Sequence, residues 1–237
     1  MALIERLTRT LFSDQVIKYT VNMAIQTILV DLDDTLYPAE CGLWAAIRAR
    51  IDRYMEEQMH LPVEEIPSLR KKLFQEYGTT MRGLHAQFHI DQIDFLNYVH
   101  DVPLKDYLKP DPSLRELLKA FPQRKIILTN ADHNHANRVI DVLGLTGIFD
   151  DIIDILRLSP FCKPQPEAFE KVLALTGGDH PNSYIFLDDS SRNLATASGM
   201  GFITVRVGSD FPDPSAHLTI RTIHELPVVL SNGKICI

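Results

Sequence analysis

The sequence has few cysteines, a single tryptophan and no excess of positive charge. Its 237 residues include three cysteines, Cys41, Cys162 and Cys236, which form no close pair. This odd, scattered set excludes a disulfide framework and a CxxC metal or redox motif, so we expect a reducing, cytoplasmic location. Lys and Arg number 24 against 31 Asp and Glu, which gives a net charge of −7. Because a nucleic acid is bound through a basic surface, we expect no nucleic-acid partner.

Long apolar runs are also missing. The most apolar stretch, residues 25–32, has the length of a strand and falls far short of the ~20 residues that a membrane span needs. Residues 1–24 contain Glu5 and Asp14 and lack the apolar region and cleavage site of a secretory signal. We therefore expect no membrane anchor and interpret residues 1–23 as a possible N-terminal extension. The hydrophobic fraction of 45% is sufficient for a folded core.

Beyond these absences, the chain alternates between strand and helix patterns. The clearest strand is residues 25–30, a β-branched run that ends in an acidic cluster at residues 31–34. Further strands are predicted at residues 125–128, 184–187 and 202–207, and helices at residues 112–120, 133–143, 166–175 and 192–199. Strands separated by helices predict an α/β fold with a doubly wound, mainly parallel, Rossmann-like sheet. Its active site is expected at the carboxyl ends of the strands.

An insert interrupts this alternation after the first strand. Its apolar positions follow helical spacing, with helices expected near residues 44–55, 63–77 and 93–99. We therefore predict a discontinuous core of residues 1–37 and 105–237, and an inserted helical domain of residues 38–104.

Polar side chains follow three of the predicted strands. In chain order they are Asp31 and Asp33, Thr129 and Asn130, and Asp188 and Asp189. Because the carboxyl ends of parallel strands converge, we expect these groups to share one crevice, together with Lys163. Clustered carboxylates repel one another, and a divalent cation is the usual means of keeping them ionised. Oxygen-only ligands favour Mg²⁺, which readily shares its ligand shell with a phosphate.

Four short motifs follow one another along the chain. They are Asp31-Leu32-Asp33-Asp34-Thr35-Leu36, Ile127-Leu128-Thr129-Asn130, Lys163-Pro164 and Leu187-Asp188-Asp189. Their order resembles that of the four motifs of the haloacid dehalogenase superfamily of phosphatases. Each motif alone is weak, but four in this order on the expected elements form a strong signal. The resemblance implies a catalytic core of the Rossmann-like type and makes the inserted helices a cap domain.

The resemblance also implies catalytic roles. Asp31 would be the nucleophile that forms an aspartyl-phosphate, and Asp33 would be the general acid and base. Thr129 would donate a hydrogen bond to the phosphoryl group, with Asn130 nearby as a substrate-binding residue. Lys163 would balance the negative charge of the nucleophile and the phosphate.

The same resemblance implies the metal ligands. Asp188, helped by Asp189, would hold Mg²⁺ together with Asp31 and the main-chain carbonyl of Asp33. For Asp189 the alternative is that it only caps the helix that follows.

Within the expected cap, two runs look like the pyrimidine 5'-nucleotidase branch of the superfamily. They are residues 76–84 and 98–101, followed by the re-entry segment 108–112. A cap that closes over the site excludes water and contacts the leaving group, so we expect Thr80, Arg82 and His85 to bind substrate. An ion-paired or solvated Arg82 is an equal alternative.

The leading prediction is a Mg²⁺-dependent phosphomonoesterase for a nucleoside 5'-monophosphate or a similar small phosphate ester. A sugar-phosphate phosphatase or a phosphomutase would use the same core. A dehalogenase is disfavoured because that chemistry has no use for Asp33 or a Mg²⁺ ligand set. A non-catalytic binding protein is disfavoured because none of the core motif residues has been lost. The expected partner is a small phosphorylated metabolite, and we expect a monomer or a homodimer.

Overall fold

The centre of the computed structural model is a six-stranded parallel sheet with the strand order β3-β2-β1-β4-β5-β6. The structure describes residues 25–178, 180–231 and 234–235, so the possible N-terminal extension lies outside the described residues. The strands are β1 (Thr27–Val30), β2 (Arg124–Leu128), β3 (Asp151–Ile153), β4 (Tyr184–Asp188), β5 (Ile203–Val207) and β6 (Leu218–Ile220). The strand order reverses at β1, and ligands of such sheets bind at the carboxyl ends beside this point.

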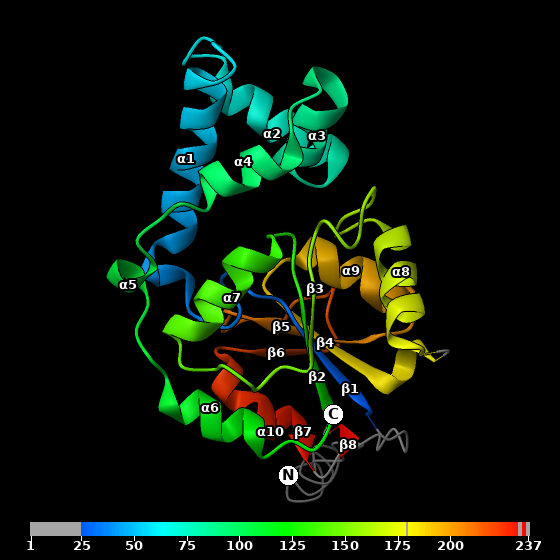
Figure 1. Cartoon of the computed structure of the whole chain (residues 1–237). Coiled ribbons are helices and arrows are strands. Elements are labelled where there is room, and N and C mark those ends of the chain that lie inside the picture. The colour runs from blue at the N-terminus through cyan, green and yellow to red at the C-terminus, as the bar shows by residue number, and fades with distance from the viewer. Residues whose placement is uncertain (1–24, 179, 232–233, 236–237) are drawn as a thin grey trace, which may run out of the picture.

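Helices cover both faces of the sheet (Figure 1). They are α6 (Pro112–Lys119), α7 (His133–Val142), α8 (Pro166–Thr176), α9 (Ser191–Gly199) and α10 (Leu226–Val229). Successive residues of β1 serve opposite faces, as the pleat of a strand requires. Ile28 and Val30 pack in the hydrophobic cluster that contains α6 and α7, whereas Leu29 packs in the cluster that contains α8 and α9. Burial on both faces explains why β1 is a continuous apolar run.

Four helices of the insert form a layer of their own above the sheet (Figure 1). They are α1 (Leu43–Glu57), α2 (Ile66–Tyr77), α3 (Thr80–Phe88) and α4 (Gln92–Val99). Tyr54 of α1 packs edge-on against Phe95 of α4, with ring centroids 4.9 Å apart. The fold class is therefore confirmed as a doubly wound parallel sheet with an inserted helical cap. The domain boundaries at residues 38 and 104 stay a prediction.

The sequence patterns did not predict several short elements. These are the edge strands β3 and β6, the short helices α5 (Leu104–Tyr107) and α10, the C-terminal pair β7 (Leu230–Ser231) and β8 (Lys234–Ile235), and α3. Helix α3 runs through Gly83, which has low helix propensity. A Cβ on Gly83 would lie 2.7 Å from the Cβ of Leu73 in α2. The helix therefore forms because the absence of a side chain lets α2 and α3 pack closely.

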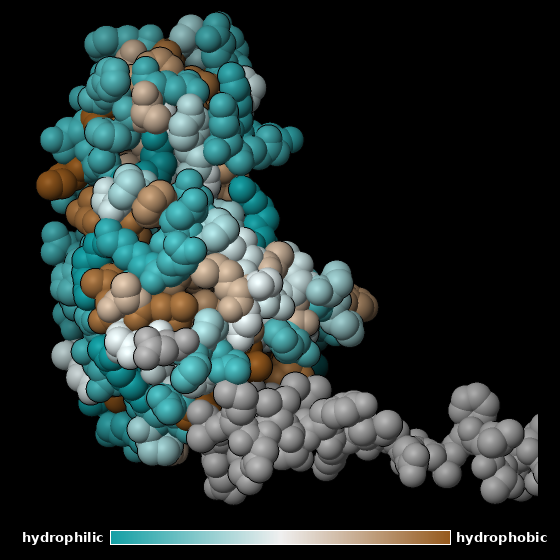
Figure 2. All heavy atoms as spheres, turned by 90° about the vertical axis from the view of Figure 1, so that its right-hand side faces the viewer, coloured by the Kyte–Doolittle hydropathy of each residue, from teal (hydrophilic) through white to brown (hydrophobic). Residues whose placement is uncertain are grey.

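The surface carries mixed polarity. On the face shown in Figure 2, apolar residues lie in small groups among hydrophilic ones. Within the described ranges, no helix combines the length and the apolar character that crossing a bilayer requires.

Candidate active site

Lys163 lies between two carboxylates at the carboxyl ends of β1 and β4. Its Nζ is 2.7 Å from Oδ1 of Asp31 and 2.8 Å from Oδ2 of Asp188, and it donates a hydrogen bond of 2.8 Å to the carbonyl of Leu128. Only 1% of Lys163 is exposed. Burial by itself lowers the pKa of an ammonium, but the two carboxylates outweigh it and raise the pKa of Lys163. The lysine is therefore a buried, permanently charged cation at the centre of the site.

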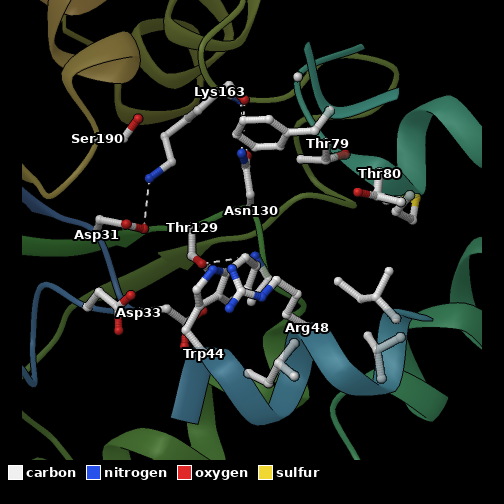
Figure 3. A pocket seen from close by; sticks show the side chains of 18 of the residues that line it. Asp31, Asp33, Trp44, Arg48, Thr79, Thr80, Thr129, Asn130, Lys163 and Ser190 are labelled. Carbon is white, nitrogen blue, oxygen red and sulfur yellow. Dashed lines mark hydrogen bonds and ion pairs between the residues drawn. The ribbon is translucent and has the colours of Figure 1, made fainter. Parts of the chain in front are cut away.

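Asn130 holds the backbone of Lys163 in place. The amide nitrogen of Lys163 donates to Oδ1 of Asn130 over 3.0 Å, and Nδ2 of Asn130 donates to the carbonyl of Lys163 over 2.9 Å. Both hydrogen bonds thus join the side-chain amide of Asn130 to the backbone of Lys163. Asn130, which we expected to bind substrate, also lines the pocket. Figure 3 shows Asn130 between Lys163 and Thr129.

Three carboxylates form an acidic cluster beside this lysine. One side-chain oxygen each of Asp31, Asp188 and Asp189 lie within 4.8 Å of one another, and no other such group is found in the described part of the chain. Burial raises the pKa of Asp31, assisted by the charges of Asp188 and Asp189 and opposed by Lys163. Burial and the charge of Asp188 raise the pKa of Asp189 to about 6. The ionised forms of Asp31 and Asp189 are therefore disfavoured as long as no further cation is present.

Two residues that the motifs did not indicate orient Asp188. Nδ2 of Asn193 lies 3.0 Å from each oxygen of the Asp188 carboxylate, and the backbone amide of Ser190 donates to Oδ1 over 2.7 Å. Both residues lie at the start of α9, immediately after the fourth motif. Proximity to that motif was the only sequence signal for them.

Asp33 lies outside the acidic cluster, and its side chain faces α7. Its Oδ1 is 3.1 Å from Nε2 of His135 and also accepts a hydrogen bond from the hydroxyl of Tyr37. Burial alone would raise the pKa of Asp33, but the contacts with His135 and Tyr37 outweigh it and lower this pKa. The carboxylate of Asp33 is thus separate from the three carboxylates that could hold a metal. The main-chain carbonyl of Asp33 stays its predicted contribution to a metal site.

Thr129 and Thr80 both line the same pocket, from the core and from the cap respectively. Thr129 is 1% exposed, and its Oγ1 accepts a hydrogen bond of 2.9 Å from the backbone amide of Ala131. Its hydroxyl hydrogen remains available to a ligand, since the bond from Ala131 uses only an oxygen lone pair.

Arg82 and His85, which we expected to contact substrate, do not line the pocket. The guanidinium of Arg82 reaches from α3 into the core and donates to the carbonyls of Ile155 over 2.6 Å and Phe161 over 3.1 Å. His85 is exposed, and its Nδ1 lies 2.9 Å from the carbonyl of Ile90. The rotation of α3 about its axis turns these two side chains away from the cavity that Thr80 faces.

The pocket is a cavity of about 420 Å³ between cap and core. Its floor carries Asp31, Asp33, Thr129 and Lys163. Its cap wall carries both apolar and polar side chains. The apolar ones are Trp44, Ile47, Ile51, Phe74, Met81, Phe95, Leu96 and Val99, and the polar ones are Arg48, Arg70, Thr79, Thr80 and His100. Trp44 and Arg48 lie one helical turn apart on α1 and reach towards Asp33 and Thr129 (Figure 3). These two pocket residues were not predicted, because an amphipathic helix does not show in sequence which of its edges meets a cavity.

Two stacked imidazoles adjoin Asp33. The rings of His135 and His100 have centroids 4.2 Å apart and are inclined by 21°. Nδ1 of His100 lies 2.5 Å from Oδ2 of Asp132. His135 follows the second motif, and His100 lies within residues 98–101 of the cap. Both histidines are thus close to motifs that the sequence shows, but the motifs gave neither of them a role.

Comparisons with known proteins agree with this geometry. Residues 25–201 match the profile of the haloacid dehalogenase-like hydrolases. The chain is 30% identical over 192 residues to Phosphate metabolism protein 8 of Saccharomyces cerevisiae, an alignment that covers 75% of this chain and 60% of the yeast protein. It is 24% identical over 229 residues to Glyceraldehyde 3-phosphate phosphatase of Methanocaldococcus jannaschii, covering 89% and 99% of the two chains.

Solved structures support the fold. The HAD-hydrolase YfnB of Bacillus subtilis, solved bound to magnesium, superposes with a TM-score of 0.60 at 17% identity, over 87% of this chain and 98% of that one. The family profile extends from the start of β1 to the end of α9 and thus includes all four motifs. The chain therefore belongs to the haloacid dehalogenase-like hydrolases.

Proposed function

We propose that this protein is a Mg²⁺-dependent phosphomonoesterase that acts through an aspartyl-phosphate on Asp31. The observation that carries the proposal is the pairing of Asp31 with the buried cation of Lys163 at the floor of the pocket between cap and core, with Asp33 beside it. A nucleophilic carboxylate that attacks a phosphate dianion needs a fixed positive charge nearby, because two anions otherwise repel each other. Lys163 supplies that charge without exposure to solvent.

The residues of the acidic cluster fit Mg²⁺. They offer three carboxylate oxygens within 4.8 Å, a hard donor set of the kind that Mg²⁺ takes from proteins. Burial, together with the charges of neighbouring carboxylates, raises the pKa of Asp31 and of Asp189, so a bound cation would favour the ionised forms of these two residues. Asp31, Asp188 and Asp189 would hold the ion, which when bound would offset the charge of the phosphoryl oxygens.

The reaction proceeds in two steps on the residues of this chain. With the phosphate dianion bound, its negative charge raises the pKa of Asp33 and favours the protonated form of this residue. A carboxylate oxygen of Asp31 then attacks phosphorus, and the bond from phosphorus to the leaving oxygen breaks while the protonated Asp33 donates its proton to that oxygen. Asp33, now ionised, then accepts a proton from water, which attacks the aspartyl-phosphate and releases inorganic phosphate. Lys163 and the hydroxyl of Thr129 hold the phosphoryl oxygens in both steps. Apolar cap residues exclude bulk water from the cavity.

The shape of the pocket favours a substrate with a flat apolar body, such as a nucleoside 5'-monophosphate. Trp44 offers an aromatic surface, 41% exposed, on the cap side of the cavity. An aromatic ring of this kind stacks on a nucleobase, and the guanidinium of Arg48 beside it can donate to base carbonyls. A small sugar phosphate is the second candidate, supported by the match to the archaeal relative over 99% of that protein's length.

The test is a phosphate-release assay with Mg²⁺ on UMP, CMP, AMP, glyceraldehyde 3-phosphate, hexose phosphates and phosphoglycolate. We expect turnover by the wild-type protein and none by Asp31→Asn. Asp101→Asn, in which the replaced side chain is 81% exposed, is the matched control and should keep full activity. Absence of phosphate release from the whole panel would refute the phosphatase proposal. Preference for the sugar phosphates would refute only the nucleotide specificity, and a transferred phosphoryl group among the products would indicate a mutase.

A further inference from the structure

We propose that His135 and His100 form a positioning pair that aligns the carboxyl group of Asp33. This alignment depends on the position of the cap against the core. The inference rests on the phosphatase function proposed above and assigns a task to two buried side chains that the mechanism does not otherwise use. Neither histidine touches the phosphorus in this scheme, and both act through Asp33.

His135 contacts Asp33 directly. The side chain of His135 is completely buried, and its Nε2 lies 3.1 Å from Oδ1 of Asp33. The hydroxyl of Tyr37 donates to the same oxygen. Two donors on Oδ1 fix the rotation of the carboxyl group, and neither uses Oδ2. Asp33 lines the cavity, and its second oxygen is therefore left for the proton transfers.

The two ring nitrogens of His135 have different surroundings. Nδ1 is buried and meets no hydrogen-bond partner among the described residues. Nε2 lies 3.1 Å from Oδ1 of Asp33, and a hydrogen on Nε2 is donated to that oxygen. His135 thus holds Asp33 by a directed hydrogen bond.

His135 also contacts the cap. Its ring stacks on that of His100, which ends α4. One carboxylate, Asp132, holds both histidines. Its Oδ2 is 2.5 Å from Nδ1 of His100, and its Oδ1 accepts a hydrogen bond of 3.0 Å from the backbone amide of His135. Asp132, the N-cap residue of α7, therefore contacts both histidines, through the ring of His100 and the backbone of His135.

Further bonds fix the segment that leads from the cap back to the core. Arg138 of α7 donates to the carbonyl of His100 over 2.9 Å and to the carbonyl of Val102 over 2.7 Å. The stack thus forms only when this segment lies against α7. Displacing it would remove the ring that supports His135, and with it the alignment of Asp33.

The first experiment compares two substitutions of His135 by steady-state kinetics on the best alkyl phosphate of the panel. His135→Leu removes the donor and should lower kcat about 10- to 100-fold with little change in KM, the size expected when an acid–base group is misplaced. His135→Gln, with an amide nitrogen near the position of Nε2, should restore most of kcat. His133→Asn, at an exposed position on the same helix, is the matched control and should behave as wild type.

A second measurement separates positioning from general damage. p-Nitrophenyl phosphate has a leaving group that needs little protonation, but hydrolysis of the aspartyl-phosphate still needs Asp33 as a base. His135→Leu should therefore release one nitrophenol per enzyme in a rapid burst and then turn over slowly. An equal loss on the alkyl and aryl substrates without a burst would overturn the proposal. If His135→Leu does not fold, His135→Asn takes its place, because its shorter amide does not reach Asp33.

A double-mutant cycle tests the link to the cap. His100→Leu should lower kcat less than His135→Leu, and the double variant should lose no more than His135→Leu alone. Fully additive losses would overturn the coupling. An active wild-type enzyme whose His135→Leu variant keeps its kcat would overturn the inference alone, whereas a wild-type protein that hydrolyses no phosphate ester would overturn the proposed function and this inference together.

Discussion

Lys163 and Asp188 form an ion pair of 2.8 Å in which the lysine side chain is 2% exposed and the carboxylate is completely buried. Because water reaches neither charge, each depends on the other and on the neighbouring Asp31. Removing one partner of a buried ion pair leaves an uncompensated charge, which costs far more than the net contribution of the intact pair.

Replacing Lys163 by methionine should therefore destabilise the fold as well as abolish turnover. The two remaining carboxylates would repel each other in a buried site, and we expect the free energy of unfolding to fall by about 3–5 kcal/mol. Urea denaturation measures this change, and added Mg²⁺ should recover part of it. Lys72→Met, at an exposed position of α2, is the control and should leave stability nearly unchanged. Equal stability of the Lys163 variant and the wild type would contradict the buried ion pair.

Mg²⁺ binding should weaken as the pH falls below 6. Burial and Asp188 raise the pKa of Asp189 to about 6, and this carboxyl group must lose its proton to bind a metal ion. We expect the Kd for Mg²⁺ to rise up to about tenfold for each pH unit below this value. Because the raised pKa favours the protonated form in the fold, the metal-free protein should lose stability as the pH rises through 6. Calorimetric titration at several pH values tests the first effect, and Asp189→Asn should flatten the pH dependence. If the Kd for Mg²⁺ depends on pH in the same way in Asp189→Asn, the proton that competes with Mg²⁺ is bound by another group.

Arg82 should stabilise the contact between cap and core. Its guanidinium bonds to the carbonyls of Ile155 and Phe161 from the opposite side of the interface. Arg82→Met would leave these carbonyls unsatisfied and should lower the free energy of unfolding by about 2–3 kcal/mol. Hydrogen exchange of residues 155–161 should accelerate in this variant but not in Arg53→Met, where the replaced side chain is 61% exposed. Unchanged exchange in both variants would show that the contact does not hold the interface.

Gly78 and Gly42 form a matched pair for testing the close approach of the cap to the Lys163 loop. Both have positive φ angles, 85° and 82°. A Cβ on Gly78 would lie 2.8 Å from Sγ of Cys162 and 3.2 Å from the carbonyl of Lys163, whereas a Cβ on Gly42 meets nothing within 4 Å. Gly42→Ala should cost only the backbone strain, about 1 kcal/mol, while Gly78→Ala adds about 1–3 kcal/mol of overpacking.

The two alanine variants should also differ in activity. Gly78→Ala should shift the backbone at Lys163 and lower kcat, whereas Gly42→Ala should have the kcat of the wild type. Thermal unfolding and steady-state kinetics of both variants measure these differences. Equal behaviour of the two variants would show that the loop tolerates displacement.

The helices α6 to α9 and the central strands were predicted to within one or two residues at most ends, because each combines a clear apolar period with a strong boundary signal. Pro112 and Pro166 begin helices, and Gly177 ends one. The edge strands β3 and β6 escaped prediction because three residues are too few to show a period. Their conformation is imposed by pairing with β2 and β5.

The sequence alone determined the fold class, because strand and helix patterns are local properties. It also determined the place of four residues relative to the strands, because motif spacing is local and parallel strands bring their carboxyl ends together. These residues are Asp31, Asp33, Lys163 and Asp188. Only the tertiary structure decided which side chains complete the site. The packing of Leu73 against Gly83 sets the rotation of α3, which turns Arg82 into the interface with the core. The stack of His100 on His135 joins the end of α4 to α7, and these two segments meet only because the cap packs against the core. Such contacts depend on the relative orientation of elements, which no local pattern encodes.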